Sequence, residues 1–430
     1  MASVSCRKRG KKWEYRFDIA KVNGARQQFS KGGFATKKDA MAAGVKALAE
    51  YNSAGMTFEP SEVSVADYMS YWLDSYCVHN VSDSTYSAYN TIIKKHITPT
   101  LGQYKLKALT TSIIQDFINN IYAQYNFKKS YMKNILKVLK GSLKYAYVTA
   151  KFINTNPGEY VSLPKMTSAA DKKEIIVLSQ EDMQTILNRF KDTPYQYYAF
   201  LTAYYTGLRV SEVYGLTWDC IDFDAKTITV DKIAKKIERE GKTSEGKVIR
   251  GIRGKANTRW YLGECKTKSS YRTIPVSDTL LNALKEYKAL QDKNLADYGE
   301  YYIKHYAKAE KSPTNRDVQR IISLPDMDIP VPYPQIYPVF IKDNGEYHGT
   351  DSARYPSKVI NDELGITFNF HALRHTHATR LIEAGTPVKT VSDRLGHGNV
   401  RTTLETYVHV TEEMQNDAVD RFDNCSGLDI

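Results

Sequence analysis

The stretch His-Ala-Leu-Arg-His-Thr-His-Ala-Thr at residues 371–379 is the densest group of cationic and proton-donating side chains in the sequence. Two phenylalanines come just before it and helix-forming residues follow, which predicts a helix. On that helix His371 and Arg374 lie three residues apart on one face, so that both can reach one phosphate group.

A zinc site is the alternative for the same stretch, because His371 and His375 have the four-residue spacing of helical zinc ligands. No glutamate follows His371, however, and Arg374 would repel a metal cation. We therefore predict that no metal binds there.

A second phrase, Tyr-Tyr-Thr-Gly-Leu-Arg-Val-Ser-Glu at residues 204–212, contains Arg209. Gly207 interrupts a helical pattern, so we expect Arg209 near the start of the next helix. A guanidinium there joins exposed backbone N–H groups, and both favour a phosphate. Glu212 can hold Arg209 in place. Taken alone, the motif also fits a purely structural Arg–Glu pair.

Lys266 lies in the polar phrase Glu-Cys-Lys-Thr-Lys-Ser-Ser-Tyr-Arg-Thr-Ile-Pro at residues 264–275, which reads as a turn leading into a strand. A lysine in a turn can donate a proton to a leaving oxygen when nearby cations lower its pKa. Lys268 competes for this role, and a surface lysine without any function is the alternative for both.

The last phrases are Leu-Gly-His at residues 395–397 and Arg-Thr-Thr-Leu-Glu-Thr-Tyr at residues 401–407. The glycines on both sides of His397 suit a tight loop that presents its ring. Tyr407 follows on what reads as a short helix. The chain has 32 tyrosines, and one taken at random would be expected to have a structural role. Tyr407 stands out because it follows shortly after a loop histidine.

Composition agrees with a partner that carries negative charge. The chain has 430 residues, enough for about three domains, and 60 Lys and Arg against 48 Asp and Glu give a net charge of +12. A basic excess favours polyanions, because neutralised phosphates release counterions, although a merely basic protein fits as well. The sequence shows neither a membrane-spanning run nor a secretory signal. Five dispersed cysteines without a Cys-x-x-Cys pair favour a reducing cytosol.

Residues 1–57 predict a small module with three strands and one helix. Residues 13–19 alternate aromatic or apolar with polar side chains, as a half-buried strand does. An Asn-Gly turn, strands around residues 27–29 and near Phe34, and a helix capped by Thr36 and Asp39 follow. Lys and Arg outnumber Asp and Glu by 12 to 5 in residues 1–60. Five of the basic residues stand just before the first expected strand and are candidates for contacting nucleic acid: Arg7, Lys8, Arg9, Lys11 and Lys12.

Residues 63–160 read as all helix, with apolar side chains at helical spacing throughout. One of the expected helices carries four lysines on a single stripe without an interleaved acid, which favours phosphate contact over a merely solvated face: Lys133, Lys137, Lys140 and Lys144.

Residues 161–177 read as a linker, and residues 178–430 as a domain of helices with short strands at 227–230 and 272–276. Ser179 and Asp182 form a capping-box pattern at its start. Two segments of this domain stand out by composition. Residues 233–262 are basic and fit either a hairpin that reaches along DNA or a disordered loop. Residues 291–350 are rich in tyrosine and proline and predict an inserted, partly irregular element.

In combination, these phrases resemble the tyrosine recombinase (phage integrase) family over nearly the whole chain. The Ser-Tyr-Arg-Thr-Ile-Pro phrase and the N-terminal module resemble integrases of conjugative transposons and Gram-positive phages. The resemblance implies a multidomain α+β fold. An arm-type DNA-binding domain (1–57) would precede an all-helical core-binding domain (63–160), a linker (161–177) and a mainly helical catalytic domain with a small antiparallel sheet (178–430).

The same resemblance implies the chemistry. Tyr407 would attack the scissile phosphate and form a 3′-phosphotyrosine. Arg209 and Arg374 would clamp the phosphate oxygens, Lys266 would protonate the leaving 5′-oxygen, His371 would assist proton transfer around Tyr407, and His397 would hydrogen-bond the phosphate. The reaction would need neither a metal, a cofactor nor ATP. Compared with the family, the 233–262 and 291–350 segments are long, and the first of them directly precedes Lys266.

The implied enzyme is a site-specific recombinase that integrates and excises a mobile element, a phage or a transposon. Its partners would be double-stranded DNA attachment sites, three further copies of itself in a tetramer on DNA, an excision factor and a host DNA-bending protein. It would act in the bacterial cytoplasm at the nucleoid. A type IB topoisomerase shares the residues but acts as a monomer. A catalytically inactive DNA-binding relative would not need the complete catalytic set, and a chromosome-resolving recombinase would be expected to lack residues 1–57. The sequence gives neither the DNA target nor the direction of reaction.

Overall fold

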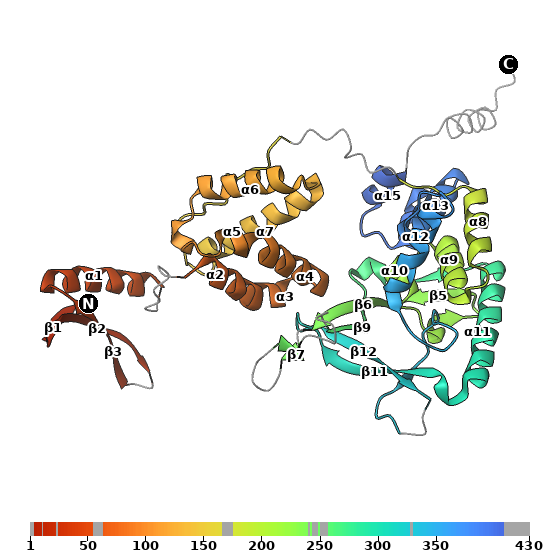
Figure 1. Ribbon diagram of the computed structural model, residues 1–430, viewed down its shortest axis with the longest axis horizontal. Coiled ribbons are helices and arrows are strands. Elements are labelled where there is room, and N and C mark those ends of the chain that lie inside the picture. Colours follow the sequence, from red (N-terminus) through yellow and green to blue (C-terminus); the bar gives the residue numbers. More distant parts are fainter. Residues whose placement is uncertain are drawn as a thin grey trace, which may run out of the picture. The chain divides into compact units, whose positions relative to one another are not determined.

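The computed structural model describes residues 4–10, 12–22, 25–54, 63–165, 175–239, 241–242, 248–249, 257–326 and 330–407. The chain divides into two compact units, Met1–Asp171 and Lys172–Ile430, whose elements are drawn in Figure 1.

The first unit opens with the predicted three-stranded sheet and helix. The sheet is antiparallel in the order β1-β2-β3. Its elements are β1 (Ser5–Arg9), β2 (Lys12–Val22), β3 (Ala25–Phe34) and the following helix α1 (Lys37–Ala54). Thr36 caps α1 as predicted, since its hydroxyl accepts a hydrogen bond from the Asp39 backbone N–H at 3.1 Å. Gly44 lets α1 approach the sheet, because a Cβ there would lie 2.9 Å from the buried Tyr15 side chain.

The order of strands corrects one part of the prediction. The strand expected near Phe34 is the end of β3, and the third strand is instead β1 at the N-terminal side. Arg7, Lys8 and Arg9 therefore lie within a strand and not before the first one. Pairing explains this: Glu14 of β2 stands opposite Arg7 and forms an ion pair with it. Charged side chains also suit an edge strand, because they discourage pairing with other chains.

Lys12, the next of the predicted basic residues, begins β2. Lys11 lies outside the described residues, and so does the predicted Asn23-Gly24 turn. The strands that this turn would join are paired as far as Val22 and Ala25.

The remainder of the first unit is helical, as predicted. Its segments are α2 (Val65–Trp72), η2 (Leu73–Cys77), α3 (Val78–Asn80), α4 (Asp83–Ile92), η3 (Ile93–Ile97), α5 (Thr98–Leu101), η4 (Leu106–Ala108), α6 (Thr111–Tyr125) and α7 (Lys129–Val148). The side chains of Ser64, Ser82 and Thr110 cap α2, α4 and α6. Trp72 and Ile97 are among the fully buried residues of the core that these helices share.

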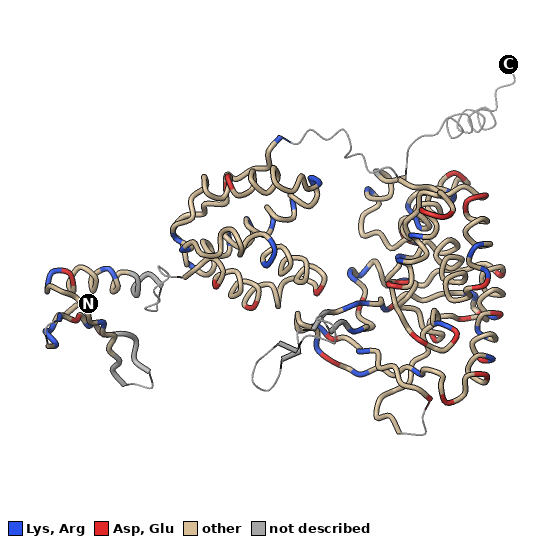
Figure 2. Tube along the Cα trace, in the orientation of Figure 1, with Lys and Arg blue, Asp and Glu red and all other residues tan. Residues whose placement is uncertain are grey.

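Helix α7 carries the predicted lysine stripe. Lys133, Lys137 and Lys144 are exposed, whereas Lys140 is half-buried and donates a hydrogen bond to the Glu159 carbonyl oxygen at 3.1 Å. The helix contains no Asp or Glu, and its lysines appear in blue in Figure 2. The opposite face is apolar and packs into the core, which fixes the direction of the stripe.

The second unit is mainly helical. Its helices are α8 (Gln180–Phe190), α9 (Pro194–Thr206), α10 (Val210–Val213), α11 (Asp278–Tyr298), α12 (Arg354–Asp362), α13 (Phe370–Glu383), α14 (Val388–Leu395) and α15 (Val400–Tyr407), with short turns η5 (Trp218–Cys220), η6 (Lys268–Ser270), η7 (Gly299–Tyr301) and η8 (Gly349–Ala353). Ser179 and Asp182 form the predicted capping box of α8. The buried helix α9 packs against α8, α11 and α13 and so holds the domain together.

Two antiparallel sheets complete the second unit. The predicted strands at 227–230 and 272–276 pair with each other, in a sheet formed by β10 (Arg272–Pro275), β5 (Thr227–Val230) and β4 (Ile221–Asp222). The larger sheet has the order β13 (Gln335–Ile336), β11 (Ile303–Lys311), β12 (Asp317–Pro325), β9 (Asn257–Glu264) and β6 (Lys232–Arg239). A further two-stranded pair consists of β7 (Gly241–Lys242) and β8 (Val248–Ile249).

The two long segments build this larger sheet together. β6 and β9 pair from Lys232 and Glu264 to Arg239 and Asn257, so the described part of the 233–262 segment is a hairpin. The 291–350 segment is more regular than predicted, because β11 and β12 form a second hairpin that pairs with β9. Alternating burial along β11 accounts for this regularity.

Among the described helices, none combines the length and apolar character that crossing a membrane requires. The cysteines that the structure describes are free thiols: Cys6, Cys77, Cys220 and Cys265.

Candidate active site

Arg209 lies at the start of α10, where the sequence predicts it. Gly207 ends α9 with a φ of 67°, and a Cβ at that position would lie 2.7 Å from the His377 and Leu395 side chains. Glu212 holds Arg209 as predicted: the Arg209 backbone N–H donates to Glu212 Oε2 at 2.9 Å, and Nη1 donates to Oε1 at 2.8 Å. About a third of the Arg209 side chain remains exposed, which leaves it accessible to a ligand.

Arg374 is almost completely buried, with 1% of its surface exposed. Its Nη1 donates to the Gly207 carbonyl oxygen at 2.8 Å, and its Nη2 donates to the Leu395 carbonyl oxygen at 2.7 Å. Its Nε has no hydrogen-bond partner among the described groups. Burial lowers the pKa of Arg374 to about 9, and the charge of Arg209 contributes to this shift. A buried cation with an unmet donor is stabilised by an anion such as a phosphate.

Tyr407 ends the described part of α15 and is buried, with 6% of its surface exposed. Its hydroxyl and His375 Nδ1 are 2.9 Å apart and hydrogen-bonded. Burial raises the pKa of Tyr407, while the charges of Arg374 and Arg209 oppose this shift. The phenol is therefore protonated at neutral pH and must lose its proton to act as a nucleophile.

His375 is a site residue that sequence reasoning missed. The sequence suggests it only as a partner of His371 in a metal site, although it directly follows Arg374 on α13. His371 itself is exposed, and its ring meets the His375 ring edge to face with centroids 4.5 Å apart. Thus His375 contacts the His371 ring on one side and is hydrogen-bonded to the Tyr407 hydroxyl.

His397 is presented by the predicted glycine turn. Gly396 ends α14 with a φ of 71°, and the His397 backbone N–H donates to the Ser392 carbonyl oxygen at 3.0 Å. The His397 ring is parallel to that of Tyr407 with centroids 6.5 Å apart, and its Nδ1 is hydrogen-bonded to Thr403 Oγ1 at 2.7 Å. Burial lowers the pKa of His397 to about 4, helped by the charges of Arg374 and Arg209.

Lys266 and Lys268 are both exposed in the segment that joins β9 to β10. The preceding residue, Cys265, is buried next to the cations: burial raises the pKa of its thiol to about 11, Glu212 raises it too, and Arg272 and Arg209 lower it. This segment therefore begins at the arginine cluster. The choice between Lys266 and Lys268 as the acid stays a prediction.

Arg272 is a second residue that sequence reasoning missed, although it stands in the Ser-Tyr-Arg-Thr-Ile-Pro phrase. Its Nη2 donates to Glu212 Oε2 at 2.9 Å, its Nη1 to the Ser270 carbonyl oxygen at 2.9 Å, and its Nε to the Arg394 carbonyl oxygen at 2.7 Å. Burial alone would raise the pKa of Glu212, but the hydrogen bond and charge of Arg272, with the charge of Arg209, hold it below its ordinary value. Glu212 is thus an ionised carboxylate between two arginines.

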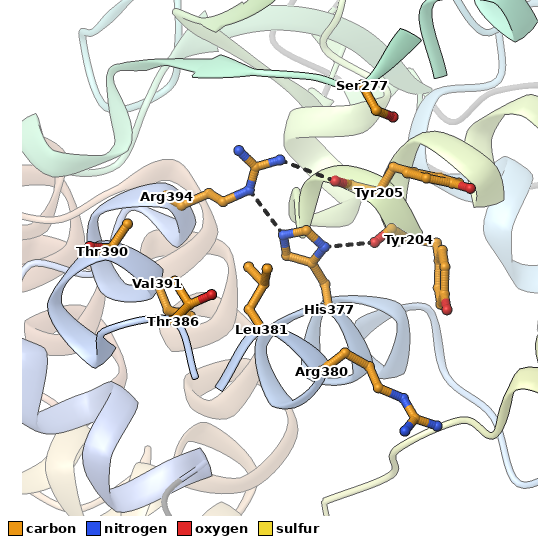
Figure 3. A pocket seen from close by; sticks show the side chains of 10 residues that line it. All are labelled: Tyr204, Tyr205, Ser277, His377, Arg380, Leu381, Thr386, Thr390, Val391 and Arg394. Atoms are coloured by element: carbon orange, nitrogen blue, oxygen red, sulfur yellow. Dashed lines mark hydrogen bonds between the residues drawn. The ribbon is translucent and has the colours of Figure 1, made fainter. Parts of the chain in front are cut away.

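A pocket of about 490 Å³ lies among α9, α13 and α14 (Figure 3). Arg394 reaches across it and donates from Nε to His377 Nε2 at 3.1 Å and from Nη2 to the Tyr205 carbonyl oxygen at 3.2 Å. Burial lowers the pKa of His377 to about 4, so it is neutral and can accept this bond. None of the six predicted catalytic residues lines the pocket.

Comparison with known proteins gives the family. Residues 177–414 match the phage integrase family, residues 64–122 match the phage integrase N-terminal SAM-like domain, and residues 2–50 match the Arm DNA-binding domain. The chain belongs to the phage integrase family. The recognition made from its motifs, the multidomain α+β fold class and the enzyme class, a tyrosine-type site-specific recombinase, are confirmed.

The chain is 27% identical over 372 residues to a XerC-like tyrosine recombinase of Caldanaerobacter subterraneus subsp. tengcongensis, covering 85% of this chain and 84% of that one. It is 24% identical to the ICEBs1 integrase of Bacillus subtilis over 90% of both chains. Among solved structures, the Tn1549 transposon integrase in complex with transposon right end DNA superposes with a TM-score of 0.57 at 20% identity, covering 84% of this chain and all of that one. The structural likeness supports the fold.

Proposed function

We propose that this integrase cuts and rejoins DNA at attachment sites through a 3′-phosphotyrosine at Tyr407, and so integrates and excises a mobile element. The observation that carries the proposal is the surroundings of the Tyr407 hydroxyl. It is buried and hydrogen-bonded to a histidine, and Arg374 and Arg209 both act on its charge. This environment suits a phenol that becomes an anion while it attacks a phosphodiester.

The two arginines would bind the non-bridging oxygens of the scissile phosphate. Arg374 cannot move far, since two backbone carbonyl oxygens hold its Nη1 and Nη2. Arg209 is held by Glu212 and still partly exposed. Charge builds up on the phosphate oxygens in the transition state, so donors fixed before DNA binds lower the barrier without reorganising. Removing one such donor costs roughly 10²–10³-fold in rate in well-studied enzymes.

The remaining roles follow from the family resemblance and the local geometry. His397 would donate to a phosphate oxygen: when the Thr403 hydroxyl donates to Nδ1, the one proton of the neutral imidazole sits on Nε2. Lys266 would protonate the leaving 5′-oxygen, with Lys268 as the alternative. His371, exposed beside His375, would assist proton transfer around Tyr407. The phosphotyrosine stores the energy of the broken bond, so the reaction reverses without ATP or a metal.

For this reaction we propose the same domain organisation that the sequence predicts. Residues 1–57 would bind accessory arm-type DNA, with Arg7, Lys8, Arg9, Lys11 and Lys12 as contacts. Residues 63–160 would bind the core site, with phosphate contacts from the α7 lysines. Residues 161–177 would link them to the catalytic domain, residues 178–430.

Strand exchange between two duplexes breaks four strands, so four copies of Tyr407 must act on one DNA assembly. We infer a homotetramer on DNA for this reason. An excision factor and a host DNA-bending protein would set the direction of the reaction, which would take place at the bacterial nucleoid in the cytoplasm.

Covalent capture tests the proposal and finds the target sequence in the same experiment. The full-length protein is incubated in EDTA with supercoiled plasmids that carry random-sequence inserts. SDS stops the reaction, and the DNA linked to protein is isolated and sequenced. We expect an adduct on a defined sequence that is absent with Tyr407→Phe. An adduct that persists in Tyr407→Phe, or none in the whole library, contradicts the proposal.

A second step separates recombination from topoisomerase activity. Two plasmids of different size, each with the captured sequence, are incubated together with the protein. An integrase produces their cointegrate, whereas an enzyme that only relaxes DNA leaves two relaxed circles.

A further inference from the structure

We propose that His375, rather than the first histidine of the 371–379 stretch, takes the proton from the Tyr407 hydroxyl when that oxygen attacks the phosphate. The proposal rests on the proposed function and names the general base within the same site. A general base must lie within hydrogen-bonding distance of the proton that it removes, at about 2.6–3.2 Å between heavy atoms. His375 Nδ1 lies 2.9 Å from the phenol oxygen.

The fold fixes this contact from both sides. His375 follows Arg374 on α13, whose guanidinium donates to two backbone carbonyl oxygens. Ala372 and Thr376 on the same helix are completely buried, so packing sets the orientation of the helix. Tyr407 is buried on α15, with its ring centroid 5.4 Å from that of His375. The hydrogen bond thus joins two side chains whose backbones are held by packing.

The other two histidines are arranged for different tasks. His397 Nδ1 is bonded to Thr403, and its ring lies parallel to that of Tyr407 with the centroids 6.5 Å apart. His371 is exposed and meets His375 edge to face. It stands where a proton leaving His375 would pass to solvent.

The charged and titratable groups around the phenol favour this transfer. Arg374 on α13 and Arg209 before α10 lower the pKa of Tyr407 against the effect of burial. His371 lies beside His375 on the same helix. The ring of His397 lies parallel to that of Tyr407, and its lowered pKa keeps it neutral. The two arginines stabilise the phenolate, and His375 needs only to accept the proton.

Every proton and bond is accounted for in this step. The Tyr407 O–H bond breaks and its proton moves to His375 Nδ1, while the phenol oxygen forms a bond to phosphorus. The bond from phosphorus to the 5′-oxygen breaks, and that oxygen takes its proton from Lys266. In the rejoining step the 5′-hydroxyl gives its proton back to Lys266, which cleavage left neutral, and its oxygen forms a bond to phosphorus. The phosphotyrosine bond breaks, and the Tyr407 oxygen takes a proton from His375.

The test uses the full-length protein and duplexes that carry the captured target sequence, in two versions. One has the ordinary 5′-bridging oxygen and the other a 5′-bridging sulfur, which leaves without a proton. Adduct formation is followed over time for the wild type, His375→Ala, His375→Asn, His371→Ala and Lys266→Ala. Asn can keep a hydrogen bond to Tyr407 but cannot take up a proton. His348→Ala, an exposed histidine of the same unit, is the matched control.

On the oxygen duplex we expect both His375 variants to react about 10²–10⁴-fold more slowly than the wild type at neutral pH. The lower rate of the His375 variants should persist on the sulfur duplex. Lys266→Ala, in contrast, should form the adduct there at the wild-type rate, because the sulfur leaves without a proton. The deficit of the His375 variants should shrink at high pH, where the phenol ionises by itself, and when free imidazole is added to His375→Ala. The rate of adduct formation should fall less in His371→Ala than in the His375 variants, and it should not change in His348→Ala.

The result that overturns the inference is wild-type reactivity of His375→Asn, or a His375 deficit that the sulfur duplex removes. A large loss in His371→Ala with His375→Ala unaffected assigns the base to His371 instead. Failure of the proposed function looks different, because the wild type then forms no adduct on any duplex. Non-covalent binding and thermal unfolding of each variant show that it is folded.

Discussion

Two sets of cations in this integrase are held in opposite ways. In the second unit, the buried Arg374 and Arg272 donate to backbone carbonyl oxygens, and Glu212 lies between Arg272 and Arg209. In the first unit, the lysines of α7 face solvent from a helix that carries no acid. The first set is positioned by the protein itself, whereas we expect the second to take its final position only on DNA.

This difference separates catalysis from binding. Fixed donors lower a reaction barrier because no reorganisation is needed when charge develops. Exposed lysines mainly release counterions from the DNA and so contribute affinity without specificity. Substitutions in the two sets should therefore change different measurements, with effects that decrease from the fixed set to the exposed one.

The largest effect is expected for Arg374→Lys. A lysine has neither the fork that spans the Gly207 and Leu395 carbonyl oxygens nor the remaining Nε–H. The rate of adduct formation should fall by at least about 10²–10³-fold, while non-covalent affinity for DNA changes little. Single-turnover cleavage and a gel-shift titration measure the two quantities. A parallel loss of affinity and rate would mean that Arg374 acts mainly in binding.

Glu212→Gln tests how the fixed set is held. The substitution keeps the shape but removes the charge between Arg209 and Arg272, and breaking a buried ion pair costs about 3–5 kcal/mol of unfolding free energy. The pKa of Glu212 is lowered in the folded chain. Its contribution is therefore fully present above the ordinary glutamate pKa and is lost as the pH falls through the lowered value.

Urea denaturation of the wild type and Glu212→Gln across this pH range measures the contribution. The difference in unfolding free energy should be largest at neutral pH and narrow in acid, because only the wild type has a carboxylate there to protonate. Glu363→Gln, which removes an exposed partner of Arg189, is the matched control and should change stability little. A difference that stays constant with pH would contradict the ion-pair account.

The sequence predicts a contact well when the two interacting residues are close together along the chain. Arg209 and Glu212 are three residues apart, and the Ser179–Asp182 cap spans the same interval, so helix geometry alone brings them together. The glycines that end α9 and α14 likewise fix local turns. The order of the family motifs predicts the fold class, which is confirmed, and the catalytic residues, which stay a prediction.

Contacts that depend on packing lie beyond such local rules. Arg272 reaches Glu212 across 60 residues, and His375 reaches Tyr407 across 32. The pairing of β12 with β9 joins two segments that each look like an isolated extension in the sequence. In the N-terminal sheet, the basic run reads as a stretch before the first strand because its partner, Glu14, lies on the next strand.

The N-terminal sheet extends the comparison, because Arg7, Lys8, Arg9 and Lys12 are also exposed. The surplus of 12 basic over 5 acidic side chains in residues 1–60 leads us to expect that residues 1–57 bind DNA separately. Deleting them should leave adduct formation on a short core duplex unchanged and abolish binding to a second segment of the attachment region. Footprinting of both proteins over that region measures this. Equal affinity of both proteins for every segment would rule it out.

The smallest effects are expected in the α7 stripe. Lys133→Ala, Lys137→Ala and Lys144→Ala should each weaken DNA binding by a similar factor on any sequence. Each should also reduce the slope of log affinity against log salt by about 0.9, the value for one phosphate contact.

The cleavage rate at saturating DNA should stay at the wild-type value in all three, because none of them belongs to the fixed set. Lys293→Ala, an exposed lysine of α11, is the control without a change in slope. Lys140 offers a sharper test within the same helix. Its ammonium is already bonded to the Glu159 carbonyl oxygen, so it must give up a partner to reach a phosphate, and Lys140→Ala should lose less affinity than its neighbours. An equal loss at all four positions would show that DNA binding, and not the folded chain, decides where these lysines point.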